Sequence, residues 1–179
     1  MQSVPAIFLD RDGIINRAIV REGMPYPPVK PDEMELLPWT LRSFAKLQSA
    51  GYMLIGVTNQ PDVARGKQSR EEVEAMNAWI QERVPLQEIL VCYHDDRDNC
   101  DCRKPKPGLI LRAAARYSLN LLESWMVGDR WKDIAAGQAA GLKTIFVDYH
   151  YHEIYRSNPA DFVVEDTAQI DDIILKGIK

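Results

Sequence analysis

The stretch IFLDRDGIIN, residues 7–16, decides how the chain is interpreted, because an apolar run ends directly in two aspartates that flank an arginine. Carboxylates two positions apart at the end of a strand repel each other, and neither keeps its charge at low cost once it is partly desolvated. A bound cation removes that cost. The stretch therefore predicts a buried strand that ends in a cation site at Asp10 and Asp12.

The bulk composition narrows the class of protein. A chain of 179 residues with 46% hydrophobic and 27% charged residues is typical of one soluble globular domain, so we expect a single domain over 1–179. A net charge of −4 without a Lys/Arg run argues against a nucleic-acid partner. Neither a signal pattern nor the roughly 20 apolar residues of a membrane helix is present. We expect a cytoplasmic monomer, without a membrane or nucleic-acid partner, that binds a small metabolite.

Apolar runs alternate with amphipathic segments along the whole chain. Strands are expected at 6–10, 52–59, 88–93, 124–129, 143–148 and 161–165, and helices at 38–50, 69–83, 107–119, 131–141 and 167–176. Ser69 and Glu72 have the spacing of a capping box. Strands that alternate with helices need crossover connections, which predicts a three-layer α/β/α fold with a mainly parallel sheet.

The longest irregular part is the proline-rich span 17–38. Loops of this length in compact domains are often lids or binding loops. The alternative is a surface excursion that covers the edge of the sheet, and the sequence does not choose between the two.

Polar residues follow several of the predicted strands at the point where each strand ends. In open parallel sheets, ligands bind beyond the carboxyl ends of the strands. Asp10, Asp12 and Asp129 offer the hard oxygen ligands that Mg²⁺ prefers, while Thr58 and Asn59 can donate to a phosphate. Lys104 adds a positive charge. A single Asp after a strand is most often a turn or cap residue, but complementary groups at four strand ends favour a site.

A second cluster lies in the segment CYHDDRDNCDC, residues 92–102, which holds all three cysteines of the chain. Cys92, His94, Cys100 and Cys102 form the pattern C-x-H-x5-C-x-C, which suits a closed tetrahedral site for a structural Zn²⁺. The alternative is a group of reduced cysteines beside a surface histidine. A zinc loop at 92–102 would fix the residues that follow it, Arg103 and Lys104. His150 and His152 have no further soft ligand nearby and are expected at a strand end or on the surface.

Four motifs together resemble those of the haloacid dehalogenase-like (HAD) phosphohydrolases. They are LDRDG (9–13), VTNQ (57–60), RKPKPG (103–108) and VGDRWKD (127–133), in this order over nearly the whole chain. The resemblance implies a Rossmann-like HAD fold and a phosphatase that works through an aspartyl-phosphate. By this resemblance Asp10 attacks phosphorus, and Asp12 protonates the leaving oxygen and later activates water.

The resemblance also implies how the remaining site residues act. Mg²⁺ would be held by Asp10, the backbone carbonyl of Asp12, and Asp129. Thr58 and Lys104 would bind the phosphoryl oxygens, with Asn59 and Gln60 of the same motif as further phosphate- or substrate-binding residues. Asp133 would orient a metal-bound water or cap a helix. Apart from the resemblance, strand alternation predicts that the side chain of Arg11, which lies between the two aspartates, points away from them, and we expect it to form a salt bridge.

Three segments resemble a narrower group, the heptose bisphosphate phosphatases and the related histidinol-phosphate phosphatases, which are small and lack a cap domain. They are the zinc loop, NQPDVARGK (59–67) and CDCRKPKPG (100–108), and VARGK favours the heptose enzymes. By this resemblance Arg103 and Arg130 would grip the phosphate that is not cleaved.

Two departures from the narrower group affect the choice of substrate. Ile14 stands where Thr is usual, and Pro61-Asp62 stands where Ser-Gly is usual. The expected function is hydrolysis of heptose 1,7-bisphosphate at position 7. Histidinol phosphate or another small sugar phosphate is the alternative substrate, and a non-catalytic zinc-stabilised binding module is the alternative of another class.

Overall fold

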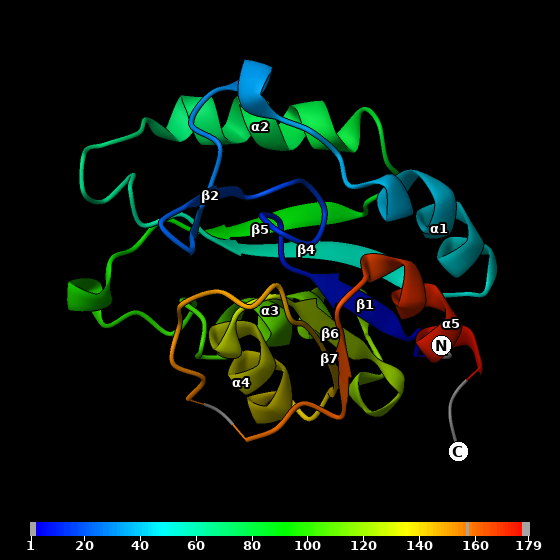
Figure 1. The fold of residues 1–179 in the computed structure, drawn as a ribbon. Helices are drawn as coiled ribbons and strands as arrows, with labels where there is room; N and C mark the ends of the chain where they lie inside the picture. The colour runs from blue at the N-terminus through cyan, green and yellow to red at the C-terminus, as the bar shows by residue number, and fades with distance from the viewer. Residues whose placement is uncertain (1–2, 157, 177–179) are drawn as a thin grey trace.

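The apolar runs form one parallel sheet at the centre of the molecule (Figure 1). The computed structural model describes residues 3–156 and 158–176. Its six-stranded sheet has the order β5-β4-β1-β6-β7-β8. The strands are β1 (Ala6–Leu9), β4 (Met53–Asn59), β5 (Glu88–Cys92), β6 (Trp125–Gly128), β7 (Lys143–Val147) and β8 (Phe162–Val164). All six predicted strands are confirmed, and each neighbouring pair is parallel.

Helices cover both faces of this sheet, which confirms the three-layer architecture. On one face lie α1 (Pro38–Ser49), α2 (Arg70–Gln81) and α5 (Ile170–Lys176), and on the other lie α3 (Gly108–Tyr117) and α4 (Trp131–Ala139) (Figure 1). The predicted capping box of α2 is present, since the Ser69 hydroxyl accepts from the Glu72 backbone N–H and Glu72 accepts from that of Ser69. Short 3₁₀ helices lie at Pro31–Glu33, Asp96–Asp98, Leu121–Glu123 and Thr167–Gln169.

Strand β1 lies in the middle of the sheet and is buried on both faces. Ile7 and Leu9 pack into the core beneath α1 and α2, whereas Ala6 and Phe8 pack into the core beneath α3 and α4. All four side chains are fully buried. A central parallel strand that is apolar on both faces is held rigidly by its neighbours. Whatever follows Leu9 is therefore presented from a fixed position.

The span 17–38 contains a β-hairpin that the sequence patterns did not predict. Strands β2 (Ile19–Arg21) and β3 (Met24–Tyr26) pair antiparallel, with Arg21 opposite Met24. Both turn residues have positive φ, 51° at Glu22 and 74° at Gly23, which is the backbone of a type I′ turn. Glu-Gly is a weaker signal for this turn than Asn-Gly or Asp-Gly, so the hairpin was missed.

The strand order fixes where the polar strand ends meet. The chain builds outward from β1 through β4 to β5, then returns to place β6 on the other side of β1. Ligand sites of open parallel sheets lie at such a reversal, beyond the carboxyl ends of the strands. Asp10 follows β1 and Asp129 follows β6, so the two are neighbours across the reversal. Among the described helices, none has the length and apolar character needed to cross a bilayer.

Trp39 ties α1 to the loop that follows Asp12. Its indole N–H donates to the Ile14 carbonyl at 2.7 Å, and the ring is 1% exposed. Trp39→Phe leaves that buried carbonyl without its donor, so we expect the free energy of unfolding to fall by about 1–3 kcal/mol in urea denaturation. Trp79→Phe is the control, because Trp79 is partly exposed and stacks on Arg83. Equal losses for the two variants would contradict a specific role for the hydrogen bond.

Candidate active site

One cavity of about 360 Å³ gathers the polar residues at the strand ends. Its lining includes every residue that the sequence motifs assigned to catalysis, to Mg²⁺ or to phosphate and substrate: Asp10, Asp12, Thr58, Asn59, Gln60, Arg103, Lys104, Asp129 and Arg130. These residues come from four separate segments of the chain. The parallel sheet brings them together because β1, β4 and β6 are adjacent and point the same way.

Lys104 connects the segments at the floor of the cavity. Its ammonium contacts the Asp10 carboxylate at 2.8 Å, the Asp133 carboxylate at 2.6 Å and the Val57 carbonyl at 2.7 Å. Burial alone would lower the pKa of Lys104, but the charges of Asp10 and Asp133 reverse this effect and raise it. The lysine therefore stays a cation in a buried site, with a fixed place beside Asp10.

Asn59 holds the backbone of Lys104 in place. The Asn59 side-chain amide donates to the Lys104 carbonyl at 3.0 Å and accepts from the Lys104 backbone N–H at 3.1 Å. Both ends of this amide are therefore engaged with protein. Asn59 lines the cavity as predicted, and it also joins the end of β4 to the segment that follows the Cys/His loop.

Three carboxylates converge on the same point. Asp10, Asp129 and Asp133 each offer an oxygen within 4.8 Å of the others, and all three residues are buried. Burial and the negative charge of Asp133 raise the pKa of Asp10 to about 7. Burial and the charge of Asp10 raise the pKa of Asp129 well above its ordinary value.

The Asp129 carboxylate is buried without ordinary hydrogen bonds to its oxygens. Neither of its oxygens accepts a hydrogen bond of ordinary geometry from a described residue, although both are buried. Such a group is costly unless a cation or a proton neutralises it. Hard oxygen ligands of this kind fit Mg²⁺. Asp133 is engaged differently, because it accepts from the Arg130 backbone N–H at the start of α4 and binds Lys104.

Gly13 makes room for Asp129. Its φ is +97°, and a Cβ at this position would lie 2.0 Å from an oxygen of the Asp129 carboxylate. Backbone of this kind is strained for other residues, and here the space is taken as well. The glycine that follows Asp12 is therefore required by the approach of the β6 end to the β1 end.

Asp12 is held by a set of donors on one side of the cavity. Its carboxylate accepts from Asn16 at 2.9 Å, from Gln60 at 2.9 Å and from Arg11 at 2.9 Å. The same Gln60 amide also donates to the Thr58 hydroxyl at 2.9 Å. Gln60 thus fixes the Asp12 and Thr58 side chains relative to each other.

Arg11 forms the expected salt bridge but does not point away from both aspartates. Its guanidinium pairs with Asp12, donates to the Asn77 side chain, and is fully buried. The expected direction was wrong because strand alternation stops at Leu9. The backbone turns there, with the N–H groups of Ile15 and Asn16 both bonded to the Arg11 carbonyl.

The two arginines expected to bind phosphate line the cavity, and each has a carboxylate partner. Arg103 contacts Asp96 at 2.7 Å, and Arg130 contacts Glu153 through two of its nitrogens at 2.5 Å each. Both pairs fix a guanidinium at the cavity wall. Each also leaves donors of the fork that are not used by its carboxylate partner.

Several cavity residues were not singled out from the sequence. Met24, Pro25, Tyr26 and Pro27 form a wall, so the 17–38 span lies against the site and does not merely cover a sheet edge. Arg65, Lys67 and Lys132 add positive charge. Of these, Lys132 could have been found from its place between Asp129 and Asp133 in the acidic motif.

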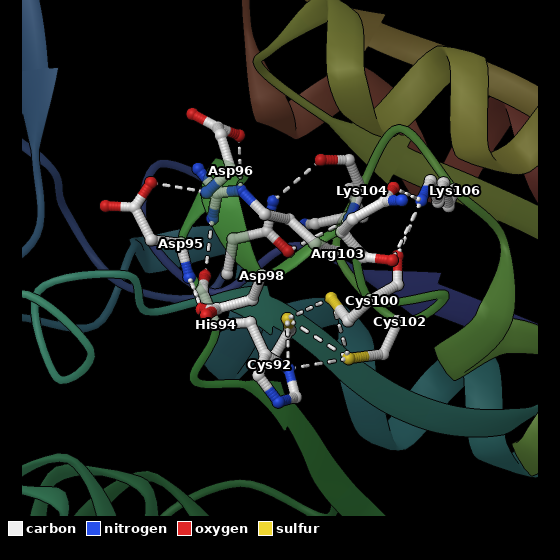
Figure 2. A network of polar contacts seen from close by, with 12 residues as sticks. Cys92, His94, Asp95, Asp96, Asp98, Cys100, Cys102, Arg103, Lys104 and Lys106 are labelled. Atoms are coloured by element: carbon white, nitrogen blue, oxygen red, sulfur yellow. Dashed lines mark hydrogen bonds and ion pairs between the residues drawn. The ribbon is translucent and has the colours of Figure 1, made fainter.

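The Cys/His cluster is assembled in the structure as the spacing predicted (Figure 2). The Cys102 sulfur lies 3.2 Å from that of Cys92, 3.4 Å from that of Cys100 and 3.3 Å from Nδ1 of His94. A tetrahedral metal with bonds of about 2.3 Å to sulfur needs edges of about 3.8 Å. The four groups are therefore close to the size of such a site, and no disulfide joins the cysteines.

The cluster is linked to the cavity by ion pairs of its loop. Asp95 pairs with Arg65. Asp96 pairs with Arg103, which directly follows the last cysteine (Figure 2). Lys106 donates to the Cys100 carbonyl at 2.8 Å. The position of the cluster therefore determines where Arg103 and Lys104 enter the cavity.

Comparisons with known proteins agree with this geometry. A model of the HAD-hydrolase-like family matches residues 101–170. A D-glycero-beta-D-manno-heptose-1,7-bisphosphate 7-phosphatase of Salmonella typhi is 34% identical, over 99% of this chain and 99% of its own length. The crystal structure of the D,D-heptose 1,7-bisphosphate phosphatase of B. bronchiseptica, complexed with magnesium and phosphate, superimposes with a TM-score of 0.78 at 27% identity. That alignment covers 97% of this chain and 99% of the other.

A further solved structure extends the likeness. A putative HAD-like phosphatase from Mesorhizobium loti has a TM-score of 0.78 and 30% identity, and the alignment covers 97% of this chain and 85% of that one.

Gly13→Ala tests the close approach of the β1 and β6 ends. The added methyl group has to displace the Asp129 carboxylate, so we expect at least about a tenfold loss of affinity for Mg²⁺, measured by titration calorimetry. Gly51→Ala is the matched control, because Gly51 has a similar φ of +94° but no atom within 4 Å of the place that a Cβ would take. It should lose only about 1 kcal/mol of unfolding free energy to backbone strain and keep its Mg²⁺ affinity. Equal affinities in the two variants would refute the steric account.

Proposed function

The chain belongs to the haloacid dehalogenase-like hydrolases and is a phosphatase, and we propose that it removes the 7-phosphate of D-glycero-D-manno-heptose 1,7-bisphosphate with the help of Mg²⁺. The observation that carries the proposal is the buried carboxylate of Asp10, held at 2.8 Å from the Lys104 ammonium on the floor of the shared cavity. The name of the relative that spans the whole chain supports the substrate.

In this proposal Asp10 is the nucleophile. One of its oxygens is held by Lys104, and its carboxylate lies at the end of a rigid central strand. It attacks phosphorus, the bond to the sugar oxygen breaks, and an aspartyl-phosphate forms on Asp10. The positive charge of Lys104 and the hydroxyl of Thr58 are positioned to stabilise the negative charge of the transferred phosphoryl group.

Asp12 is proposed to move the proton. It lines the same cavity, and Gln60 and Asn16 hold its carboxylate in one orientation. Protonated Asp12 donates to the leaving sugar oxygen as the bond to phosphorus breaks. The resulting carboxylate then takes a proton from the water that hydrolyses the aspartyl-phosphate, which restores both residues.

Mg²⁺ is proposed to bind at Asp10, the backbone carbonyl of Asp12, and Asp129. Both oxygens of Asp129 are buried and accept no hydrogen bond of ordinary geometry from a described residue, which supports this assignment. When bound, the metal would neutralise the carboxylates and draw charge from the phosphoryl oxygens. Asp133 would stay a positioning residue, because its oxygens already bind Lys104 and the start of α4.

We propose Zn²⁺ as the ion of the Cys92, His94, Cys100 and Cys102 cluster. Three thiolates and one imidazole fill four positions, so no place remains for a reacting water. The role of this ion is structural. It would hold the 92–102 loop and, through the adjacent chain, Arg103 and Lys104.

Asp10→Asn tests the nucleophile. The amide cannot form the aspartyl-phosphate, so we expect phosphate release from heptose 1,7-bisphosphate to fall on the order of a thousandfold or more, with an unchanged zinc content. Asp32→Asn, an exposed acid outside the cavity, should retain full activity. Histidinol phosphate, assayed alongside, tests the alternative substrate. Appreciable turnover by Asp10→Asn would rule out Asp10 as the nucleophile.

His94→Ala tests the structural metal. Loss of one ligand should release zinc and lower the melting temperature by at least about 5 °C, because metal binding stabilises the folded state. His150→Ala is the matched control, since His150 is exposed and lies outside the cluster. Zinc content is read by mass spectrometry of the metal. A His94→Ala variant that is as stable as His150→Ala and contains no zinc would remove the structural role.

A further inference from the structure

The segment 148–153 contacts the active site from a part of the chain that none of the four sequence motifs includes. It follows β7, the strand that pairs with β6, and β6 ends directly before Asp129. Two of its residues, Tyr149 and Tyr151, are partly buried, and the centres of their rings lie 5.6 Å apart. The strand order therefore brings two tyrosines close to the proposed Mg²⁺ site.

The backbone of this segment is held on both sides of the two tyrosines. Before them, the Asp148 N–H donates to the carbonyl of Val164 in β8 at 2.8 Å. After them, the His152 N–H donates to the carbonyl of Gly23 in the turn of the β2–β3 hairpin at 2.9 Å. The tyrosine hydroxyls are therefore presented from a segment whose position is fixed by the sheet and by the hairpin.

Tyr149 holds the glycine that follows Asp12. Its hydroxyl donates to the Gly13 carbonyl at 3.0 Å, across 136 positions of sequence. The Gly13 N–H donates to the Asn16 carbonyl at 2.7 Å, so both polar groups of this glycine are bonded. A glycine rotates about φ and ψ more freely than any other residue. The tyrosine supplies the restraint on the Gly13 carbonyl that a side chain at this position cannot supply.

The position of Gly13 determines the position of two proposed metal ligands. Its N–H belongs to the same rigid peptide plane as the Asp12 carbonyl. Its Cα lies against the Asp129 carboxylate, since a Cβ there would be 2.0 Å from a carboxylate oxygen. A rotation at Gly13 would therefore move the Asp12 carbonyl and the space for Asp129 together.

Tyr151 lies on the other side of Asp129. Both residues line a second cavity of about 350 Å³, and Asp129 lines the active-site cavity as well. Burial raises the pKa of Tyr151, and the charge of Asp129 and a polar contact with its carboxylate raise it further. The hydroxyl therefore keeps its proton and is a donor beside a carboxylate. Carboxylates that bind a metal through one oxygen are commonly hydrogen-bonded through the other.

We propose that Tyr149 and Tyr151 are positioning residues of the Mg²⁺ site. Tyr149 holds the Asp12 carbonyl in place through Gly13, and Tyr151 orients the Asp129 carboxylate by donating to the oxygen that does not bind the metal. This inference rests on the proposed function, because it takes the Asp12 carbonyl and Asp129 as ligands of Mg²⁺. Neither tyrosine touches the metal or the substrate in this account.

Calorimetric titration of Mg²⁺ into the Mg²⁺-free protein tests the inference. Tyr149→Phe and Tyr151→Phe each remove one hydroxyl and keep the ring, so we expect each to raise Kd for Mg²⁺ on the order of tenfold. Tyr117→Phe is the matched control, because Tyr117 is also partly buried but lies outside the active-site cavity, and its hydroxyl has no hydrogen-bond partner among the described residues. Its Kd should equal that of the wild type.

Two further readouts separate positioning of the metal ligands from a merely structural role. The Mg²⁺ concentration that gives half-maximal phosphate release should rise by about the same factor as Kd, while kcat at saturating Mg²⁺ stays within about threefold of the wild type. The rise in melting temperature that a fixed Mg²⁺ concentration produces should be smaller in both variants, because the ion stabilises the folded state less when it binds more weakly.

Three results would overturn the inference. A tyrosine variant that binds Mg²⁺ as tightly as Tyr117→Phe has lost nothing that positions the metal. Equal losses of melting temperature with and without Mg²⁺, at an unchanged Kd, would make the hydroxyls structural. A large loss of kcat that saturating Mg²⁺ does not restore, again at an unchanged Kd, would place the hydroxyls at the substrate.

Because the titration contains no substrate, it also separates this inference from the substrate assignment. If the wild-type protein hydrolyses no heptose bisphosphate but Kd for Mg²⁺ rises in Tyr149→Phe and Tyr151→Phe, the substrate assignment fails and the role of the tyrosines stands. If turnover is normal and Kd does not change, the role of the tyrosines fails and the substrate assignment stands.

Discussion

The ammonium group of Lys104, held between the carboxylates of Asp10 and Asp133, is the contact on which the rest of the site depends. It joins the end of β1 to the start of α4 through a residue that follows the Cys/His loop. Asp129 completes the group. When Asp10, Asp129 and Asp133 are ionised, their three negative charges and the one positive charge of Lys104 give the group a net charge of −2. A divalent cation balances that charge. Without the cation, a proton on one carboxylate reduces the negative charge, and Asp10 can hold such a proton because its pKa is raised to about 7.

The sheet positions the reacting residues, whereas the loops form the parts of the cavity wall that contact the rest of the substrate. The sheet fixes Asp10, Thr58 and Asp129, because Asp10 and Asp129 directly follow β1 and β6 and Thr58 lies near the end of β4, three adjacent parallel strands. The loops supply what distinguishes one phosphate ester from another: the β2–β3 hairpin, the 59–67 segment and Arg103, which directly follows the Cys/His loop, all contribute to the cavity wall. This division explains how a small chain can combine the shared chemistry of its family with a selective site.

Much of this arrangement was predictable from local patterns. The strands, the helices and the convergence of four strand ends follow from hydrophobic runs and from the geometry of parallel sheets. What could not be predicted depends on partners distant in the sequence. Nothing near Asn59 indicates that its amide holds the Lys104 backbone, 45 positions away. The direction of the Arg11 side chain was predicted wrongly because the alternation of side chains along β1 was assumed to continue past Leu9, the last residue of the strand. The Glu22-Gly23 turn was missed because its sequence signal is weak.

Proton release on Mg²⁺ binding tests the central claim most directly. Calorimetric titration of the metal-free protein at about pH 6.5, in buffers of different ionisation enthalpy, measures how many protons leave as the ion binds. Because the pKa of Asp10 is raised to about 7 by burial and by Asp133, the account predicts net release of protons at this pH, together with an apparent affinity that rises toward about pH 8. Binding without proton release and with the same affinity across this range, or no Mg²⁺ binding at all, would contradict a buried carboxylate cluster that requires the cation.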